Sequence, residues 1–494
     1  MVACRFGRSS CSAFLKCKTP ASSHHPIDQS HRTTPLTPIS SSWPSRQNNN
    51  NLHISLNEPR ILLHHPNQQH SSGFTMIRSC IRNLIYIVVT VAYIGVTFYS
   101  SGAIGLQTSP TQSSQRPHGL IFSGDEVAIG IDVEVGVDYG TQNQSERRIL
   151  AASPILGFYN QSNGPLADWM ADVPDHTPLI DMNIPGTHDS ATWNYTEATQ
   201  SSMTNITGQL PPAIAYQCQD RSLFQMLGDG IRFLDLRIGF LPGSQELGFF
   251  HASALQSSTA TLPDVLLGFY RWLDDHPTET VLISMKVDNA TFANPSSGGQ
   301  PSSPKLQSMI RELLTNELGS RYWVQKNGTL GTLGEARGKL VFLQRIQWDS
   351  PMLGIALPPS QFNDNDPSFA LVYNERTGAT AYIEDFYNIL PNPSTFEDKV
   401  AWKLEITVEN LIRASGPKHS DQLYISFASG GALRNTPPVT PQMLAVGGNG
   451  TAGVNSGLTE YLSNNRGKRF GIVILDWYAS SPELVKSIID RSYQ

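Results

Sequence analysis

Short apolar runs alternate with amphipathic stretches from about residue 155 to the end of the chain. Several runs are continuously apolar, as in strands buried on both faces of a parallel sheet. The strand candidates are residues 179–184, 231–237, 247–251, 280–286, 339–344, 380–384, 423–427 and 471–475. The helix candidates are residues 263–275, 305–318, 401–414 and 482–491. This pattern predicts an α/β fold, a distorted (βα)8-type (TIM-like) barrel over residues 155–494. A doubly wound open sheet is the alternative.

The first 154 residues lack this alternation. Residues 1–75 are rich in Ser, His, Pro, Asn and Gln without an apolar period, so we predict a disordered low-complexity extension. Residues 76–105 begin with basic residues, continue through an uncharged apolar stretch and end in small residues, a pattern typical of a signal peptide or signal anchor. Residues 106–154 are interpreted as a linker or a propeptide, with a small hairpin as a further alternative.

The signal pattern begins at Met76, so we hypothesise that Met76 is the natural start and that residues 1–75 are a mis-assigned extension. Arg78 and Arg82 flank the apolar stretch, so a retained anchor would leave the rest of the chain facing outward. We therefore expect a secreted or extracellular-facing protein, in the second case signal-anchored to the membrane. Glycosylation sequons, all after residue 140, agree with this: Asn143, Asn160, Asn194, Asn205, Asn289, Asn327 and Asn449.

Composition excludes several classes of function. The net charge of −6 lacks the basic excess of a nucleic-acid-binding protein, so no nucleic-acid partner is expected. Cys218 is the one cysteine in the predicted barrel, so no disulfide framework can form there. The chain has no CxxC or HExxH zinc pattern, no P-loop and no GxSxG serine-hydrolase motif.

Chemically capable side chains follow the apolar runs. His188 and His251 stand at predicted strand ends, Arg237 lies between them in the sequence, and Asp476 follows the last run. Active sites of such barrels lie where strands end. Two histidines can serve as base and acid, and an arginine can hold a phosphate. Either histidine alone is more readily explained as structural, so the prediction rests on the combination.

Six of these segments resemble the X-domain of phosphatidylinositol-specific phospholipase C, and most of all its bacterial, metal-independent form. They are IPGTHDSA (184–191), GIRFLDLR (230–237), FFH (249–251), ETVLISMK (279–286), ARGKLVFLQR (336–345) and GIVILDW (471–477). The segments occur in the order of the family and span roughly residues 165–490. The resemblance implies a barrel enzyme that cleaves phosphatidylinositol, or an inositol glycolipid, to diacylglycerol and a 1,2-cyclic inositol phosphate.

The resemblance also implies catalytic roles for five residues. His188 would be the base that deprotonates the inositol 2-hydroxyl, and Asp476 would orient it. Arg237 would bind the phosphate. His251 would be the acid that protonates the diacylglycerol oxygen, with Asp189 as its partner carboxylate.

Five further residues resemble substrate-binding positions of the family. Asp235 would support the arginine, while Lys286 and Arg345 would lie in the inositol pocket. Asp385 and Tyr387 match the inositol hydrogen-bonding and stacking positions, in a part of the chain where the match is poor.

No metal and no cofactor are expected. The position of Arg237 resembles that of an acidic metal ligand in the calcium-dependent enzymes of the family, and a guanidinium at that position repels Ca²⁺. The expected partner is a membrane phospholipid, and we expect a monomer that contacts the membrane surface transiently. Trp477 and Tyr478 are candidates for that contact, unless they pack inside the rim. Two alternatives remain: a metal-dependent phosphodiesterase that uses Asp189 and Asp235, or a non-catalytic binding ectodomain.

Overall fold

The structure is a computed structural model of the chain, and it describes residues 141–288, 303–389, 395–448, 450–491 and 493. The predictions for residues 1–75 and 76–105, and that for 106–154 up to residue 140, lie outside this part, as do the sequons at Asn289 and Asn449 and the side chain of Asn143. Among the described helices, none is long and apolar enough to cross a membrane.

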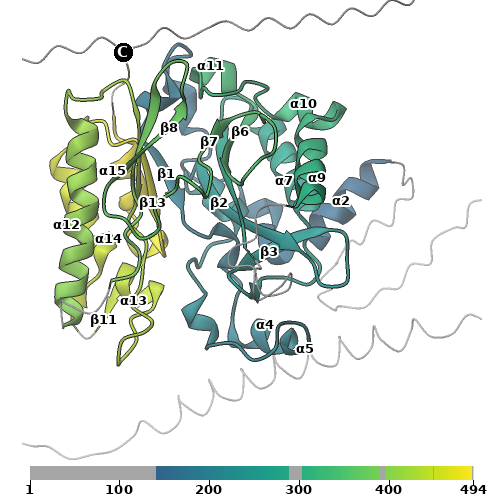
Figure 1. Cartoon of the computed structure of the whole chain (residues 1–494), viewed down its shortest axis with the longest axis horizontal. Coiled ribbons are helices and arrows are strands. Elements are labelled where there is room, and N and C mark those ends of the chain that lie inside the picture. The colour runs from purple at the N-terminus through teal and green to yellow at the C-terminus, as the bar shows by residue number, and fades with distance from the viewer. Residues whose placement is uncertain (1–140, 289–302, 390–394, 449, 492, 494) are drawn as a thin grey trace, which may run out of the picture. The chain divides into compact units, whose positions relative to one another are not determined.

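One large sheet forms the centre of the described region (Figure 1). Its strands are β1 (Ile184–Thr187), β2 (Phe233–Phe240), β3 (Leu247–His251), β4 (Ala254–Leu255), β5 (Thr280–Val287), β6 (Lys339–Arg345), β7 (Ile355–Ala356), β8 (Phe369–Asn374), β9 (Ala379–Glu384), β10 (Leu423–Phe427) and β13 (Ile472–Leu475). The strands β11 (Gly447–Gly448) and β12 (Thr451–Ala452) form a separate hairpin.

The strand order is β7-β6-β5-β2-β1-β13-β10-β9-β8, in which every neighbouring pair except β9–β8 is parallel. The first strand β1 therefore pairs directly with the last strand β13, as a barrel requires. This confirms the predicted TIM-like barrel. The barrel is nearly closed and distorted, because β7 is very short and the antiparallel β8 lies at the end of the sheet. Strand β3 is antiparallel to β2. The prediction of residues 247–251 as a parallel strand of the barrel is therefore wrong, and they extend its rim.

Helices flank the sheet (Figure 1) and connect most of its parallel strands, but the described segment from β6 to β9 contains no α-helix. They are α2 (Thr141–Ala151), α3 (Ser153–Leu156), α4 (Glu197–Ser202), α5 (Thr204–Thr207), α6 (Leu223–Gly228), α7 (Leu262–Asp275), α9 (Pro304–Thr315), α10 (Glu317–Tyr322), α11 (Leu333–Ala336), α12 (Phe396–Ser415), α13 (Pro441–Val446), α14 (Val454–Asn464) and α15 (Leu484–Ile489). The helix predicted over 305–318 is divided at Asn316, whose side chain caps α10 by accepting from the Gly319 N–H.

The continuous apolar runs have a physical cause in two hydrophobic cores. Phe233, Leu282, Ile472 and Ile474 belong to a core inside the barrel. Their direct neighbours Leu234, Ile283, Val473 and Leu475 belong to the core between the sheet and the helices. Because successive side chains of a strand point to opposite faces, every position must be apolar. At Gly186 a side chain would collide with Phe233, so glycine lets β1 and β2 pack closely inside the barrel.

A buried ion pair joins the end of β9 to helix α12. Lys403 Nζ lies 2.7 Å from Glu384 Oε1, and neither side chain is exposed. Lys403 also donates to the Phe386 carbonyl at 2.7 Å, and Thr407 donates to Glu384 Oε2. Burial raises the pKa of Glu384 above its ordinary value, against the opposing effect of Lys403.

We expect Lys403→Met to lower the free energy of unfolding by about 3–5 kcal/mol, because it leaves the Glu384 carboxylate buried and uncompensated. Urea denaturation at neutral pH measures the loss. Lys486→Met is the matched control, because Lys486 pairs with Glu483 in solvent at 4.0 Å and such pairs contribute little. Equal effects of the two substitutions would contradict the prediction.

Candidate active site

The site is built by strand parity and register. His188 continues the inward face of β1 set by Ile184 and Gly186, and Asp476 continues the inward face of β13 set by Ile472 and Ile474. β1 pairs with β13 through Thr187 and Leu475, so the next residues of the two strands, His188 and Asp476, meet.

The same rule places a row of cations. Arg237, Lys286 and Arg345 are direct register partners on β2, β5 and β6. All three lie on the inward face, at even spacing from the core residues Phe233, Leu282 and Val341 of their strands. Parallel strands end at the same rim, so the three cations line one edge of the barrel interior.

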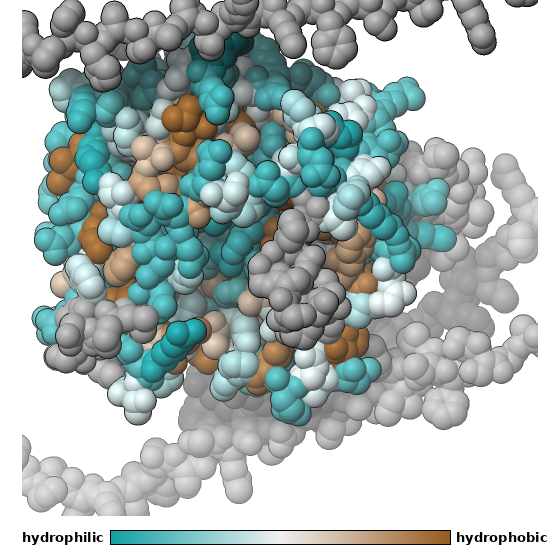
Figure 2. Space-filling view, in the orientation of Figure 1, coloured by the Kyte–Doolittle hydropathy of each residue, from teal (hydrophilic) through white to brown (hydrophobic). Residues whose placement is uncertain are grey.

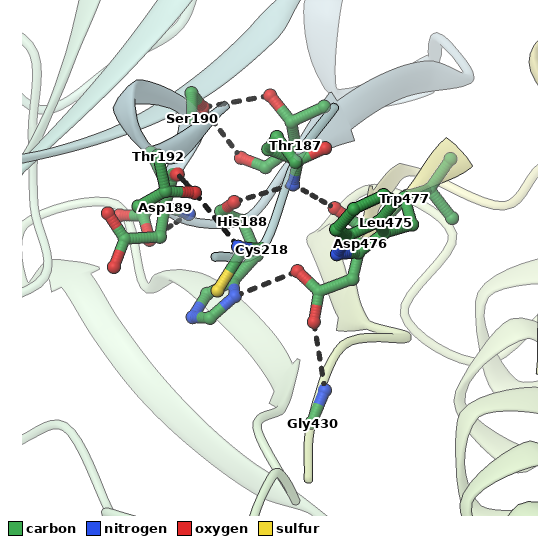
Figure 3. A network of polar contacts seen from close by, with 12 residues as sticks. Thr187, His188, Asp189, Ser190, Thr192, Cys218, Gly430, Leu475, Asp476 and Trp477 are labelled. Carbon is green, nitrogen blue, oxygen red and sulfur yellow. Dashed lines mark hydrogen bonds and ion pairs between the residues drawn. The ribbon is translucent and has the colours of Figure 1, made fainter. Parts of the chain in front are cut away.

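His188 is held by a buried carboxylate, as Figure 3 shows. Its Nδ1 lies 3.0 Å from Asp476 Oδ1, and the Gly430 N–H donates to Asp476 Oδ2 at 3.2 Å. Nε2 of His188 lies 2.6 Å from an Nη2 of Arg237. A guanidinium only donates hydrogen bonds, so Nε2 must accept and the ring proton must lie on Nδ1, facing Asp476. The imidazole therefore presents an unprotonated nitrogen to the pocket, as a general base requires.

Arg237 lies at the centre of three carboxylates. Its Nε is 3.3 Å from Asp235 Oδ2 and 3.5 Å from Asp189 Oδ2, and its Nη1 is 3.6 Å from Asp288 Oδ2. Burial by itself lowers the pKa of Arg237, but the carboxylates of Asp189, Asp235 and Asp288 outweigh it and raise that pKa well above its ordinary value. Burial raises the pKa of Asp235, yet Arg237 and Arg345 hold it far below its usual range.

His251 reaches the same pocket from β3. Its ring centroid is 6.2 Å from that of His188, with the two planes nearly perpendicular. Nδ1 lies 2.8 Å from the Tyr216 carbonyl and 3.1 Å from Asp189 Oδ2. Burial, together with the charges of Arg237 and His188, lowers the pKa of His251 to about 3. This imidazole is therefore neutral near neutral pH when the pocket holds no anion.

Asp189 is fully buried beside these groups, and neither of its carboxylate oxygens takes part in a hydrogen bond. Burial raises its pKa well above the ordinary value, and Arg237 opposes that shift. Its Oδ2 lies 3.5 Å from Arg237 Nε and 3.1 Å from His251 Nδ1.

The substrate-binding candidates surround this centre. Arg345 lies 3.7 Å from Asp235 and 4.0 Å from Asp385, and it stacks over the Phe362 ring. Burial raises the pKa of Asp385, and Arg345 opposes this. Lys286 lies 3.5 Å from Asp288 rather than in direct contact with a catalytic candidate.

A pocket of about 290 Å³ opens between the two histidines. Its lining is His188, Ala215, Cys218, His251, Tyr387, Asn388, Gly430, Gly431, Leu433, Arg434, Pro441 and Asp476. Tyr387 thus lies at the mouth, where its hydroxyl donates to Asp364 at about 3.0 Å. Burial and that carboxylate raise the pKa of Tyr387 to about 12. Ten predicted site residues therefore converge on one end of the barrel.

The backbone turns sharply after both histidines and after Asp476. The residues that follow His188, His251 and Asp476 are Asp189, Ala252 and Trp477, and their φ angles are 42°, 50° and 44°. These left-handed conformations are unfavourable for residues other than glycine, and such strain is concentrated at functional sites.

The two residues that were candidates for membrane contact, Trp477 and Tyr478, are held by hydrogen bonds within the domain. Trp477 Nε1–H donates to the Gln217 carbonyl, and the hydroxyl of the buried Tyr478 donates to Asp229. Neither forms an exposed rim surface.

Several site residues were missed by sequence reasoning. Asp288 follows Lys286 at the end of β5, and that strand-end position was a usable signal. Gln219 donates to the carbonyls of both His188 and Leu475 and so fixes the ends of β1 and β13 together. Cys218 and Tyr216 come from a loop whose sequence carries no pattern that predicts its place.

Comparison with known proteins agrees with this geometry. The chain is 25% identical over 330 residues to a 1-phosphatidylinositol phosphodiesterase of Listeria monocytogenes, a match covering 66% of this chain and 84% of the relative. It is 35% identical over 135 residues to PI-PLC X domain-containing protein 1 of Danio rerio, covering 24% of this chain and 43% of the relative. The chain is a homologue of bacterial phosphatidylinositol phosphodiesterases and PI-PLC X domain-containing proteins.

A solved structure of a mutant phosphatidylinositol-specific phospholipase C from Staphylococcus aureus shares the fold, with a TM-score of 0.51 and 21% identity over 66% of this chain and 97% of that one. No protein-family profile matches the chain. The barrel is therefore that of the homologous phosphodiesterases.

Asp288 supports this site through charge. Burial by itself raises its pKa, but Lys286 and Arg237 hold that pKa below the usual range, and the Ala252 N–H donates to it at 2.9 Å. A carboxylate with a depressed folded-state pKa stabilises the protein above its unfolded pKa, and this stability is lost as pH falls through the folded pKa.

We therefore expect Asp288→Asn to cost about 1–3 kcal/mol of unfolding free energy at pH 7, with a smaller cost below about pH 4. Urea denaturation at several pH values measures both quantities. Asp172→Asn, at an exposed carboxylate, is the control and should cost little at any pH. A cost for Asp288→Asn that grows as the pH falls would refute the assignment.

Proposed function

We propose that the protein is a phosphoric diester lyase that cleaves phosphatidylinositol, or an inositol glycolipid, to diacylglycerol and a 1,2-cyclic inositol phosphate. The observation that supports it most is one pocket with two imidazoles whose centroids are 6.2 Å apart, each beside its own carboxylate, with Arg237 in contact with one of them. The homologous bacterial proteins are named as 1-phosphatidylinositol phosphodiesterases.

In the first half of the proposed reaction, Nε2 of His188 removes the proton of the inositol 2-hydroxyl. The oxygen attacks phosphorus and closes the cyclic ester. Asp476 stabilises the imidazolium, because its buried carboxylate already faces Nδ1–H. Arg237 donates to the non-bridging phosphate oxygens, the role that a metal ion fills in other phosphodiesterases.

In the second half, His251 gives a proton to the departing diacylglycerol oxygen. Its low pKa in the free protein has burial and then Arg237 as leading causes. An anionic phosphate bound against Arg237 offsets that positive field, so substrate binding raises the pKa of His251. Asp189, 3.1 Å away, favours the same protonated state. Substrate binding and protonation of His251 thus occur together.

The proposed substrate lies in a membrane, and the pocket mouth fits it in part. Tyr387 and Leu433 line the pocket while remaining 36% and 46% exposed, and Arg434 lies beside them. Apolar residues on the face shown in Figure 2 are scattered rather than gathered in one broad patch. Transient contact of a monomer with the bilayer is therefore proposed, rather than permanent insertion of this domain.

Phosphorus NMR of the products tests the proposed reaction. Purified full-length protein, mixed micelles of phosphatidylinositol and an excess of chelator should yield the cyclic inositol phosphate first and its slow hydrolysis product later. We expect turnover to persist in chelator, because Arg237 supplies the positive charge. Turnover that disappears in chelator and returns with Ca²⁺ would reject the metal-free mechanism while leaving the substrate class intact.

Variants assign the proton-transfer roles. His188→Ala should lower turnover by about 10²–10⁴-fold, since it removes one proton-transfer group. The control is His176→Ala, an exposed histidine that precedes β1 and so lies at the other end of the barrel. If His188→Ala and His176→Ala turn over equally fast, His188 is not the base.

We further propose that the domain is secreted or faces outward from a signal anchor, and that it is glycosylated. Three sequons, at Asn160, Asn205 and Asn327, are exposed. Expression of the full chain in a secreting eukaryotic cell should give a protein whose electrophoretic mobility increases after N-glycosidase treatment. Replacing these three asparagines by glutamine should reduce that change, whereas an unaltered mobility in the parent protein would argue against this proposal.

A further inference from the structure

Cys218 lies beside His188 (Figure 3) and also near His251, and the proposed reaction does not use it. Its Sγ is 3.8 Å from Nδ1 of His251 and 3.7 Å from the carbonyl oxygen of Tyr216. The possible ligand atoms of Asp189, Cys218 and His251 all lie within 4.8 Å of one another. A thiol, an imidazole and a carboxylate from three separate segments therefore converge.

Their spacing is close to that of a tetrahedral metal site. Bonds of about 2.3 Å to sulfur and about 2.0–2.1 Å to nitrogen or oxygen place neighbouring N and S ligands about 3.5 Å apart, and N and O ligands about 3.3 Å apart. The corresponding distances here are 3.8 Å for Cys218–His251 and 3.1 Å for Asp189–His251. The imidazole nitrogen would exchange its present 2.8 Å hydrogen bond to the Tyr216 carbonyl for the metal.

Asp189 provides an independent indication of a ligand. Its carboxylate is fully buried, and neither oxygen takes part in a hydrogen bond. A buried carboxylate without such bonds is costly, and a bound cation satisfies it directly. By contrast, Asp476 already accepts hydrogen bonds from His188 and Gly430. A cation bound to the alternative group of His188, Cys218 and Asp476 would therefore satisfy fewer unpaired oxygen atoms.

We propose that Asp189, Cys218 and His251 form a binding site for a thiophilic divalent cation such as Zn²⁺. Mixed sulfur, nitrogen and oxygen ligands suit zinc, whereas Ca²⁺ requires six to eight oxygens. On binding, the Cys218 thiol releases its proton to solvent, and the His251 proton moves from Nδ1 to Nε2. No redox step is involved. Arg237 repels the cation, but Asp189, Asp235 and Asp288 already surround that guanidinium.

The functional consequence rests on the proposed lyase reaction. A cation bound to Nδ1 of His251 and to Asp189 removes the acid and its partner from catalysis. The site is therefore inhibitory, and Zn²⁺ should slow turnover by competing with protonation of His251. Metal binding itself can be measured whether or not the lyase reaction is correct.

Titration of the full-length protein with Co²⁺, as a spectroscopic substitute for Zn²⁺, tests the site. We expect a thiolate-to-cobalt charge-transfer band that Zn²⁺ displaces. Cys218→Ser should abolish it and weaken Zn²⁺ binding by more than about 100-fold, because even outer-shell changes at metal sites cost about 10–100-fold. Cys4, Cys11, Cys17 and Cys80 are present in both proteins, so the difference between the two spectra reports Cys218.

Three further variants separate loss of the site from a simple loss of structure. Asp189→Asn and His251→Ala should weaken Zn²⁺ binding, while His188→Ala should retain the band. If His188, Cys218 and Asp476 bind the metal instead, His188→Ala loses the band and His251→Ala keeps it, and that outcome overturns the proposal. An unchanged spectrum in Cys218→Ser also overturns it. The ratio of turnover with and without Zn²⁺ should approach one in Cys218→Ser, whatever its own turnover.

Discussion

The buried guanidinium of Arg237 is the interaction on which the site depends. Three carboxylates, those of Asp189, Asp235 and Asp288, lie within 3.6 Å of it in a largely buried part of the barrel. Without a central cation, these acids would repel one another and their pKa values would rise. With it, Asp235 stays ionised, His188 is fixed in one tautomer and the pocket keeps a positive centre for a phosphate.

The pKa shifts follow from this single arrangement. The charge of Arg237 lowers the pKa of His251, after burial, and also that of Asp235, while Asp189 remains dominated by burial. The free protein therefore holds the His251 imidazole neutral and the pKa of Asp189 well above its ordinary value. In the proposed mechanism, an arriving anion offsets that field at His251 and so couples substrate binding to protonation of the acid. This coupling is the physical content of the proposed mechanism.

Sequence reasoning succeeded where strand parity and local chemistry decide. The runs ending in Arg237, Lys286, Arg345 and Asp476 lie on barrel strands, and alternation places those side chains inside. The strand predicted over residues 179–184 was displaced, because Leu179–Asp181 form a 3-10 helix and β1 covers Ile184–Thr187. Sequence reasoning failed where the chain turns back on itself. β3 pairs antiparallel with β2, so the strand bearing His251 adds to the rim. β7 has two residues, and β8 is partly exposed, so neither leaves a continuous apolar run that could be recognised.

The sequence alone determined the barrel class and the identity of the groups at its rim, because continuous apolar runs mark strands buried on both faces and polar, chemically capable side chains follow where these runs end. Only the tertiary structure decided distances and charges: that Asp288 joins the carboxylates around Arg237, and that Cys218 lies 3.8 Å from His251. Those facts depend on how loops from distant parts of the chain pack over the strand ends. Loop packing depends on contacts between residues far apart in sequence, which no local pattern encodes.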